Sequence, residues 1–138
     1  MKKQLIITLL LIGTASFSQA QEEVEIEKAV LTYIENFFEN KYEPMAAVMH
    51  PRLSKRGINP DNKLSDEYGL QVLKELMDNK TALPKDRQKN TVKDITIFKN
   101  VATARLDTGY PNMKWVEFIH LAKIDGKWLI MDVFWAYY

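Results

Sequence analysis

Two acidic residues near the end of the chain, Glu117 and Asp132, best fit a chemical role by type and spacing. They flank Asp125-Gly126, one of the strongest short-range signals for a two-residue hairpin turn, and this turn would place Ile119 opposite Asp132. Glu117 would then be a diagonal neighbour of Asp132 on the same face. Two carboxylates on one largely apolar face repel each other, and this repulsion raises the pKa of one of them. A carboxylate with a raised pKa suits the role of a general base that removes a proton next to a carbonyl group.

Two other roles are open to these carboxylates: lining a binding pocket without catalysis, or making structural hydrogen bonds at a rim. The two histidines carry a weaker signal. His120 lies on the opposite face of the hairpin, where a packed histidine with a satisfied nitrogen is favoured over a catalytic one. His50 precedes Pro51 and is interpreted as the end of a short helix, although its charged form would also suit a helix C-terminus at a pocket mouth.

The sequence lacks the residues that several other chemistries require. Two His and no Cys do not make a ligand set for a structural zinc ion, and neither a Gly-rich phosphate loop nor a Gly-x-Ser-x-Gly elbow is present. We therefore expect no metal and no cofactor. The chain has 19 Lys and Arg against 18 Asp and Glu, and this balance argues against nucleic acid as a partner because such binding needs a basic surface.

Residues 1–20 have the order of a secretory signal peptide: Lys2 and Lys3, an apolar run from Leu5 to Ile12, then small residues that end at Ala20. The alternative, a membrane anchor, is disfavoured because the apolar run is shorter than the roughly 20 residues that span a bilayer. We predict an exported protein, periplasmic or extracellular, with no membrane association after cleavage. Residues 21–138 have the length of a single domain.

Helical periodicity dominates the first half of this domain. A broad amphipathic helix is predicted over Glu22–Asn40, and a short one over Pro44–Met49 that stops at His50-Pro51. Arg52–Leu64 is predicted to be a loop or an irregular hairpin. A third helix is predicted to begin at Ser65, followed by a polar connection. Its apolar face would consist of Tyr68, Val72, Leu76 and Met77.

Alternation with period two begins at Val92 and predicts two antiparallel hairpins. In the first, a turn at Lys99-Asn100 would pair Asp94 with Arg105 on the wet face. In the second, both faces are mostly apolar. One face would carry Trp115, Glu117, Ile119, Leu121, Trp128, Ile130, Asp132, Phe134 and Ala136. The other would carry Val116, Phe118, His120, Ala122, Ile124, Leu129, Met131, Val133 and Trp135.

Neither apolar face can be left to water without an unusually large exposed patch. The helices can cover one face, and a second copy of the chain is the simplest cover for the other. The sequence therefore predicts a homodimer through the sheet. Its interface would include Phe118, His120, Met131, Val133 and Trp135.

Four strings carry a family resemblance: YIENFFENKYEPMAAVMHP, SKRGI, NVATARL and FIHLAKIDGKWLIMDVFW. They resemble the nuclear transport factor 2-like superfamily, and more specifically its exported bacterial branch known as putative lumazine-binding proteins, over residues 24–136. The resemblance implies an α+β, cone-shaped fold with three N-terminal helices packed on a curved antiparallel sheet. It also implies a pocket for a small aromatic ligand and dimers that pack sheet against sheet.

In related proteins the Gly-x-Trp-x-Ile string directs Trp and Ile into the cone, so the resemblance implies that Trp128 and Ile130 point inward, and alternation brings Asp132 and Phe134 with them. The chain shows no diagnostic string for the catalytic residues of steroid-isomerase-like members. The expected ligand-binding residues are Tyr33, Phe37, His50, Trp115, Glu117, Trp128 and Asp132. Tyr33 and Phe37 also suit a plain core position.

Three functions remain open on the sequence. The leading one is an exported domain that binds a small, mainly apolar or aromatic molecule without catalysis. The second is a cofactor-free enzyme of the isomerase, dehydratase or cyclase type with Asp132 or Glu117 as base. The third is a dimeric structural or interaction module whose cone is filled by its own side chains, Tyr33, Trp115 and Trp128.

Overall fold

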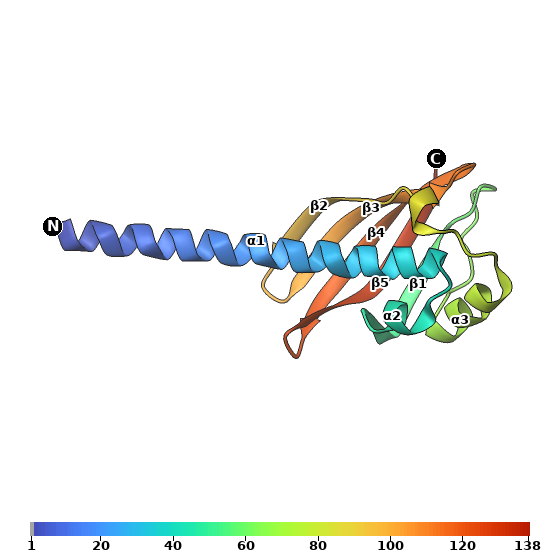
Figure 1. Ribbon diagram of the computed structural model, residues 1–138, viewed down its shortest axis with the longest axis horizontal. Helices are drawn as coiled ribbons and strands as arrows, with labels where there is room; N and C mark the ends of the chain where they lie inside the picture. Colours follow the sequence, from blue (N-terminus) through green and yellow to red (C-terminus); the bar gives the residue numbers. More distant parts are fainter. Residues whose placement is uncertain (1) are drawn as a thin grey trace.

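The computed structural model describes residues 2–138, with side chains described from Ser18 onward. Five strands form one sheet in the order β1-β5-β4-β3-β2. Helix α1 crosses one face of this sheet, and α2 and α3 lie beside its C-terminal end (Figure 1). The elements are α1 (Lys2–Phe38), α2 (Tyr42–Ala46), β1 (Met49–Ile58), α3 (Leu70–Asn79), the 3-10 turn η1 (Lys85–Arg87), β2 (Thr91–Phe98), β3 (Val101–Tyr110), β4 (Met113–Ile124) and β5 (Lys127–Tyr137).

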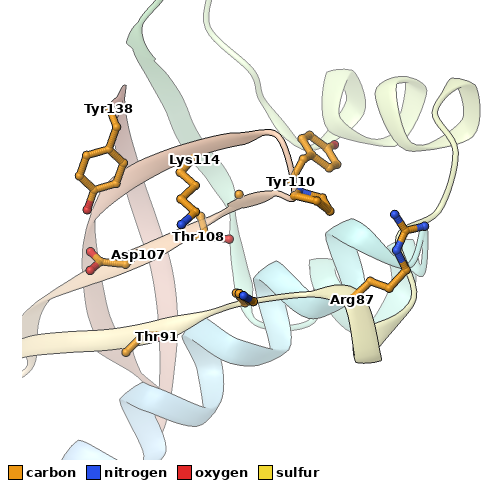
Figure 2. A pocket seen from close by; sticks show the side chains of 10 residues that line it. Arg87, Thr91, Asp107, Thr108, Tyr110, Lys114 and Tyr138 are labelled. Atoms are coloured by element: carbon orange, nitrogen blue, oxygen red, sulfur yellow. The ribbon is translucent and has the colours of Figure 1, made fainter.

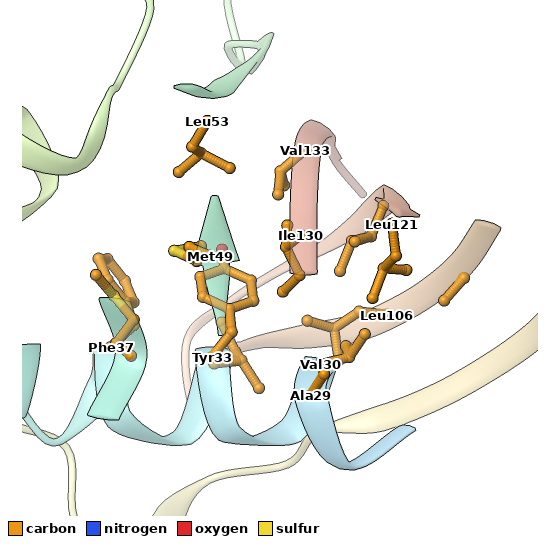
Figure 3. Packing of buried hydrophobic residues seen from close by; sticks show 14 of the residues in the cluster. Ala29, Val30, Tyr33, Phe37, Met49, Leu53, Leu106, Leu121, Ile130 and Val133 are labelled. Carbon is orange, nitrogen blue, oxygen red and sulfur yellow. The ribbon is translucent and has the colours of Figure 1, made fainter. Parts of the chain in front are cut away.

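The predicted apolar face of the first helix forms the centre of the core. Val30 and Tyr33 are fully buried and face Leu106, Ile130 and Val133 of the sheet (Figure 3). Each apolar side chain buried in this way stabilises the fold by roughly 1.5–3 kcal/mol.

Helix α1 begins well before the predicted start, at Lys2. The signal-peptide assignment of residues 1–20 stays a prediction. In the described part of the chain, no helix has both the length and the apolar character needed to cross a bilayer.

Strand β1 includes Arg52–Ile58, so the loop predicted over Arg52–Leu64 was wrong for these residues. The alternative of an irregular hairpin is met in part, by a single antiparallel bridge between Ile58 and Leu64. Strand β1 pairs in parallel with β5 and has a register shift between Met49 and Ser54, which accommodates Pro51 on an edge strand. Its inward residues include Leu53 and Lys55, both buried. A lysine at an inward position hides the period-two pattern of this strand in the sequence. With β1 the sheet has five strands, and the parallel pairing of β1 with β5 makes it mixed rather than purely antiparallel.

Helix α3 begins at Leu70, after Gly69, rather than at Ser65. The Ser65 hydroxyl oxygen instead accepts a hydrogen bond of 3.1 Å from the Gly57 backbone N–H, so the segment before the helix runs beside β1. The buried face of α3 also differs from the prediction. Leu73 and Met77 are buried, whereas Val72 and Leu76 are each 41% exposed.

The first hairpin has the predicted turn, and Phe98 pairs with Val101 as expected. A register shift follows, which puts Lys93 rather than Asp94 opposite Arg105. Asp94 has a φ of 54°, a left-handed conformation that bends its strand. The predicted Asp94–Arg105 ion pair is therefore absent from the described residues, and Arg105 contacts Asp107 at 2.9 Å instead.

The second hairpin follows the predicted register from its Asp-Gly turn as far as the pairing of Leu121 with Ile130, then shifts by one residue. His120 pairs with Asp132, so Met131 is the extra residue of a β-bulge. A one-residue slip exchanges the faces of a strand. Val133 and Trp135 consequently lie inside the core, both at most 8% exposed. Their prediction as interface residues was wrong, and Asp132 and Phe134 take their place on the outside.

Candidate functional site

A cavity of about 260 Å³ lies at the end of the core, where α1 and α3 meet the sheet. Seven segments contribute to it, and most of the contributing side chains are aromatic. We refer to it as the aromatic cavity. It is lined by Phe37, Lys55, Tyr68, Leu73, Leu76, Tyr110, Trp115, Glu117, Trp135 and Tyr137.

A buried ion pair occupies one wall of the aromatic cavity. Lys55 Nζ lies 2.6 Å from Glu117 Oε1, and the two residues are 8% and 1% exposed. Tyr33 joins them: its hydroxyl donates to Glu117 Oε2 at 2.8 Å and accepts from Lys55 Nζ at 2.7 Å. The Trp115 indole N–H donates to Glu117 Oε1 at 3.0 Å. Three donors therefore hold the carboxylate, as a buried charge requires.

The electrostatics of this cluster leave one donor for a ligand. Burial, followed by the negative charge of Glu117, raises the pKa of the Tyr33 phenol well above its ordinary value, so Tyr33 stays a neutral donor. An ammonium group has three N–H donors, and Lys55 uses two of them within the described residues. Its Nζ also lies 4.9 Å from the centre of the Trp135 ring, a cation–π contact on the cavity side.

The aromatic walls hold each other at fixed angles. Tyr68 meets Trp135 edge to face, with ring centres 5.6 Å apart, and Trp115 meets Tyr137 in the same way at 5.9 Å. Gly57 makes the position of Trp135 possible, because a Cβ on Gly57 would lie 2.3 Å from the indole ring. Rings held in this way present faces and edges to a flat molecule at little further entropic cost.

The structure brings together some of the predicted ligand-binding residues. Phe37, Trp115 and Glu117 line the aromatic cavity, and Tyr33 lies behind its wall in contact with Glu117. His50 does not line it: it is on β1, where its Nδ1 accepts from the Arg52 N–H at 3.1 Å.

Trp128 and Asp132 also lie elsewhere. Trp128 is near the β4–β5 turn, where its indole donates to Glu22 of α1. Asp132 is on the outer face of the sheet, 3.3 Å from His120 Nδ1. The predicted pair of Glu117 and Asp132 was wrong, because the bulge turns Asp132 away, and the charged partner of Glu117 is Lys55.

Sequence reasoning missed Lys55, Tyr68, Tyr110, Trp135 and Tyr137 as cavity residues. The bulge at Met131, which the sequence does not signal, puts Trp135 on the face opposite to the predicted one. A signal for Lys55 exists only if Leu53, Lys55 and Gly57 are seen as alternate positions of one strand. Among the described residues, no group of three or more His, Cys, Asp or Glu could hold a metal ion.

A family model described as putative lumazine-binding matches residues 21–136 of the chain. This span contains α2, α3, strands β1 to β4, all of β5 except Tyr137, and the C-terminal part of α1. It therefore contains every lining residue of the aromatic cavity except Tyr137. No curated protein matches the chain significantly.

Solved structures with the same architecture are numerous. A nuclear transport factor 2-like protein of unknown function from Shewanella baltica is similar, with a TM-score of 0.76, 25% identity, and 86% of this chain and 95% of that chain covered. A ketosteroid isomerase-like protein from Erwinia carotovora atroseptica has a TM-score of 0.61 at 15% identity, covering 83% and 94% of the two chains. A putative scytalone dehydratase from Novosphingobium aromaticivorans gives 0.61 at 15% identity, covering 89% and 88%. The α+β fold inferred from the resemblance is thus the fold of this chain.

Proposed function

The chain belongs to the family described as putative lumazine-binding, and on this basis we propose that it binds a small, flat aromatic molecule in the aromatic cavity. The observation that carries the proposal is the combination of fixed aromatic walls with one N–H donor of Lys55 that no residue of the described part of the chain accepts. Stacking on the rings would supply affinity, and the Lys55 ammonium would orient a carbonyl oxygen or ring nitrogen of the ligand.

The size of the cavity narrows the ligand class. At about 260 Å³ it is slightly smaller than the roughly 300–1,000 Å³ pockets of drug-sized ligands. We therefore propose a ligand whose buried part is about one or two fused rings with an acceptor atom at one edge. Lumazine, the compound in the description of the family, has this form and is the first probe to use.

Tryptophan fluorescence provides the test, because Trp115 and Trp135 both line the cavity. Titration of purified protein with lumazine should quench emission saturably, and Lys55→Met should weaken binding by at least about tenfold if a charge-assisted hydrogen bond is lost. Phe118→Ala, on the outer face, is the matched control and should bind as the parent does. Absence of saturable quenching by lumazine and by a panel of one- and two-ring carbonyl heterocycles would contradict the proposal.

An enzyme remains the second candidate, because Glu117 is a buried carboxylate that borders the cavity. Under this alternative Glu117 would be the general base, without Asp132. Its three donors weaken the case, since proton transfer would have to displace at least one of them. Glu117→Gln separates the alternatives: retained binding with lost turnover would favour an enzyme, whereas a parent protein that turns over none of the ligands it binds favours a binding domain.

The module with a filled cone is the third candidate. It has less support, because Tyr33 is packed behind the ion pair and Trp128 lies at the far hairpin. Neither side chain fills the aromatic cavity.

We further propose that residues 1–20 are removed on export to the periplasm or beyond, and that the mature chain forms a homodimer through the outer face of the sheet. The outer face supports this second proposal with exposed apolar side chains. Phe98, Val101 and Phe118 are 69%, 53% and 54% exposed. Phe98, Val101, His120 and Met131 border one shallow recess there. The removal of residues 1–20 is tested by sequencing the N-terminus of the protein that an expressing cell exports. An intact Met1 would contradict this removal.

A further inference from the structure

A second hollow, separate from the ion pair of the aromatic cavity, lies where the segment after α3 meets the ends of β2, β3 and β4. Figure 2 shows Arg87, Lys114, Asp107 and Tyr138 around it. Its volume is about 560 Å³. We refer to it as the basic groove. It is lined by Arg87, Lys89, Thr91, Asp107, Thr108, Gly109, Tyr110, Pro111, Lys114 and Tyr138.

The basic groove has an excess of uncompensated positive charge. Three cations line it: Arg87 and Lys89 from the segment after α3, and Lys114 from β4. None of the three forms an ion pair within residues 18–138. Cations gathered without counter-charges repel each other, and a bound anion relieves that repulsion.

The one acidic side chain that lines the groove, Asp107, already pairs with two cations. Its Oδ2 lies 2.7 Å from Lys93 Nζ and its Oδ1 lies 2.9 Å from Arg105 Nε. The hydrogen bond from Lys93 and the bond from Arg105 hold the pKa of Asp107 below its ordinary value despite partial burial. The negative charge of Asp107 is therefore offset by Lys93 and Arg105, neither of which lines the groove, and Arg87, Lys89 and Lys114 keep their excess of positive charge there.

The backbone under the cations is fixed by specific contacts. The Thr108 hydroxyl, whose residue is 4% exposed, donates to Asn90 Oδ1 at 2.7 Å, which ties the segment of Lys89 to β3. Gly109 has a φ of 150°, and a Cβ there would lie 2.3 Å from the Met113 carbonyl oxygen, so glycine permits the close approach of the strands next to Lys114. The backbone that carries Lys89 and Lys114 therefore does not have to become ordered when an anion binds.

We propose that the basic groove binds an oxyanion of the phosphate class. Arg87 supplies a planar guanidinium that can hold two oxygens, and Lys89 and Lys114 each supply a point charge. The oxyanion has two possible sources: a free small anion, or the anionic group of a ligand whose ring lies in the aromatic cavity. Tyr110 lines both hollows, which makes the second source geometrically reasonable. Only that second source rests on the proposed function.

Amide NMR of the full chain tests the site with inorganic phosphate, at neutral pH and with ionic strength held constant by sodium chloride. The expected result is saturable shift changes confined to the amides around Lys89, Gly109 and Lys114. The double variant Lys89→Ala, Lys114→Ala should weaken phosphate binding by at least about fivefold. Lys127→Ala, an exposed lysine at the β4–β5 turn, is the control and should leave binding unchanged. Both variants change exposed side chains, so their folds can be checked by the same spectra.

Shift changes that are equal in chloride, scattered over the molecule or undiminished in the double variant would overturn the proposal and leave an adventitious ion only. A second arm compares umbelliferone with umbelliferyl phosphate. Tighter binding of the ester than of either umbelliferone or inorganic phosphate, lost in the double variant, supports the site as one part of a larger ligand site. Phosphate binding without any umbelliferone binding supports a free anion. The function proposed for the aromatic cavity is then contradicted only if lumazine and the panel of heterocycles also fail to bind.

Discussion

Lys55 and Glu117 determine the chemical character of the aromatic cavity, because neither charge could be buried at acceptable cost without the other. Their contact of 2.6 Å is supported by Tyr33 and Trp115, so all strong polar groups of the inner wall belong to one network. Networks of this kind fix a single arrangement of side chains. A ligand therefore meets a wall whose donors and acceptors are already oriented.

Removal of one partner of this network should be costly. We expect Lys55→Met to reduce the free energy of unfolding by about 3–5 kcal/mol, because it leaves Glu117 charged and buried without a counter-charge. Combining Lys55→Met with Glu117→Gln should restore much of this loss, since the amide carries no charge. Its oxygen can take the place of Oε1 and accept from Trp115, and its NH2 can take the place of Oε2 and donate to the Tyr33 hydroxyl oxygen. Lys74→Met, which removes the exposed i,i+4 pair with Asp78, is the control and should change stability little. Urea unfolding measures all three, and equal losses in the single and double variants would contradict the argument.

Tyr33 should make the protein sensitive to alkali. Its pKa is raised in the folded state by burial and by Glu117, so above its ordinary pKa the unfolded chain releases this proton and the folded chain does not. The stabilisation is complete below that ordinary pKa and is lost as the pH rises toward the folded value. We expect the unfolding free energy to decrease with pH above about 10. Tyr33→Phe should make this decrease shallower, although it lowers stability at neutral pH. An identical alkaline slope in both proteins would refute the assignment.

At the scale of elements, the packing of β1 on β5 sets the shape of the cavity. Gly57→Ala should force Trp135 away from β1, because the added Cβ would lie 2.3 Å from its ring. We expect a loss of about 1–3 kcal/mol in stability and weaker binding of any ligand that stacks on Trp135. Gly69→Ala has nothing within 4 Å of the new Cβ and is the matched control. Unchanged stability and ligand affinity in Gly57→Ala would show that this contact does not position Trp135.

The elements also show how far sequence reasoning reaches. Helix α1 and the two hairpin turns follow from local signals, namely the 3.6-residue periodicity and Asp125-Gly126, whose φ angles of 50° and 77° suit the predicted tight turn. The bulge at Met131 has no such signal, because Asp132 and Val133 each suit either face of an apolar hairpin. Its position decides whether Asp132 or Lys55 faces Glu117, so the sequence predicts part of the cavity lining and not its charged pair.

At the scale of the whole molecule, the mixed sheet has one face under α1 and one outer face that carries exposed Phe98, Val101 and Phe118. Since Val133 and Trp135 are buried, the proposed dimer has to rely on the remaining predicted residues, Phe118, His120 and Met131. Exposed aromatic side chains at the centre of a patch are frequent anchors of interfaces. The outer face is thus a smaller and more polar interface than the sequence predicted.

Light scattering after size exclusion tests the dimer directly. We expect the parent protein to have twice the mass of one chain, and Phe118→Asp to shift it to the monomer, because the single two-fold symmetric interface would bury two unpaired charges, one from each copy. Val24→Asp is the control: Val24 is 57% exposed on α1, away from the outer face, and its replacement should leave the mass unchanged. A monomeric parent at high concentration would refute the dimer. The aromatic cavity lies on the other side of the sheet, so lumazine binding should survive in Phe118→Asp whichever oligomer is found.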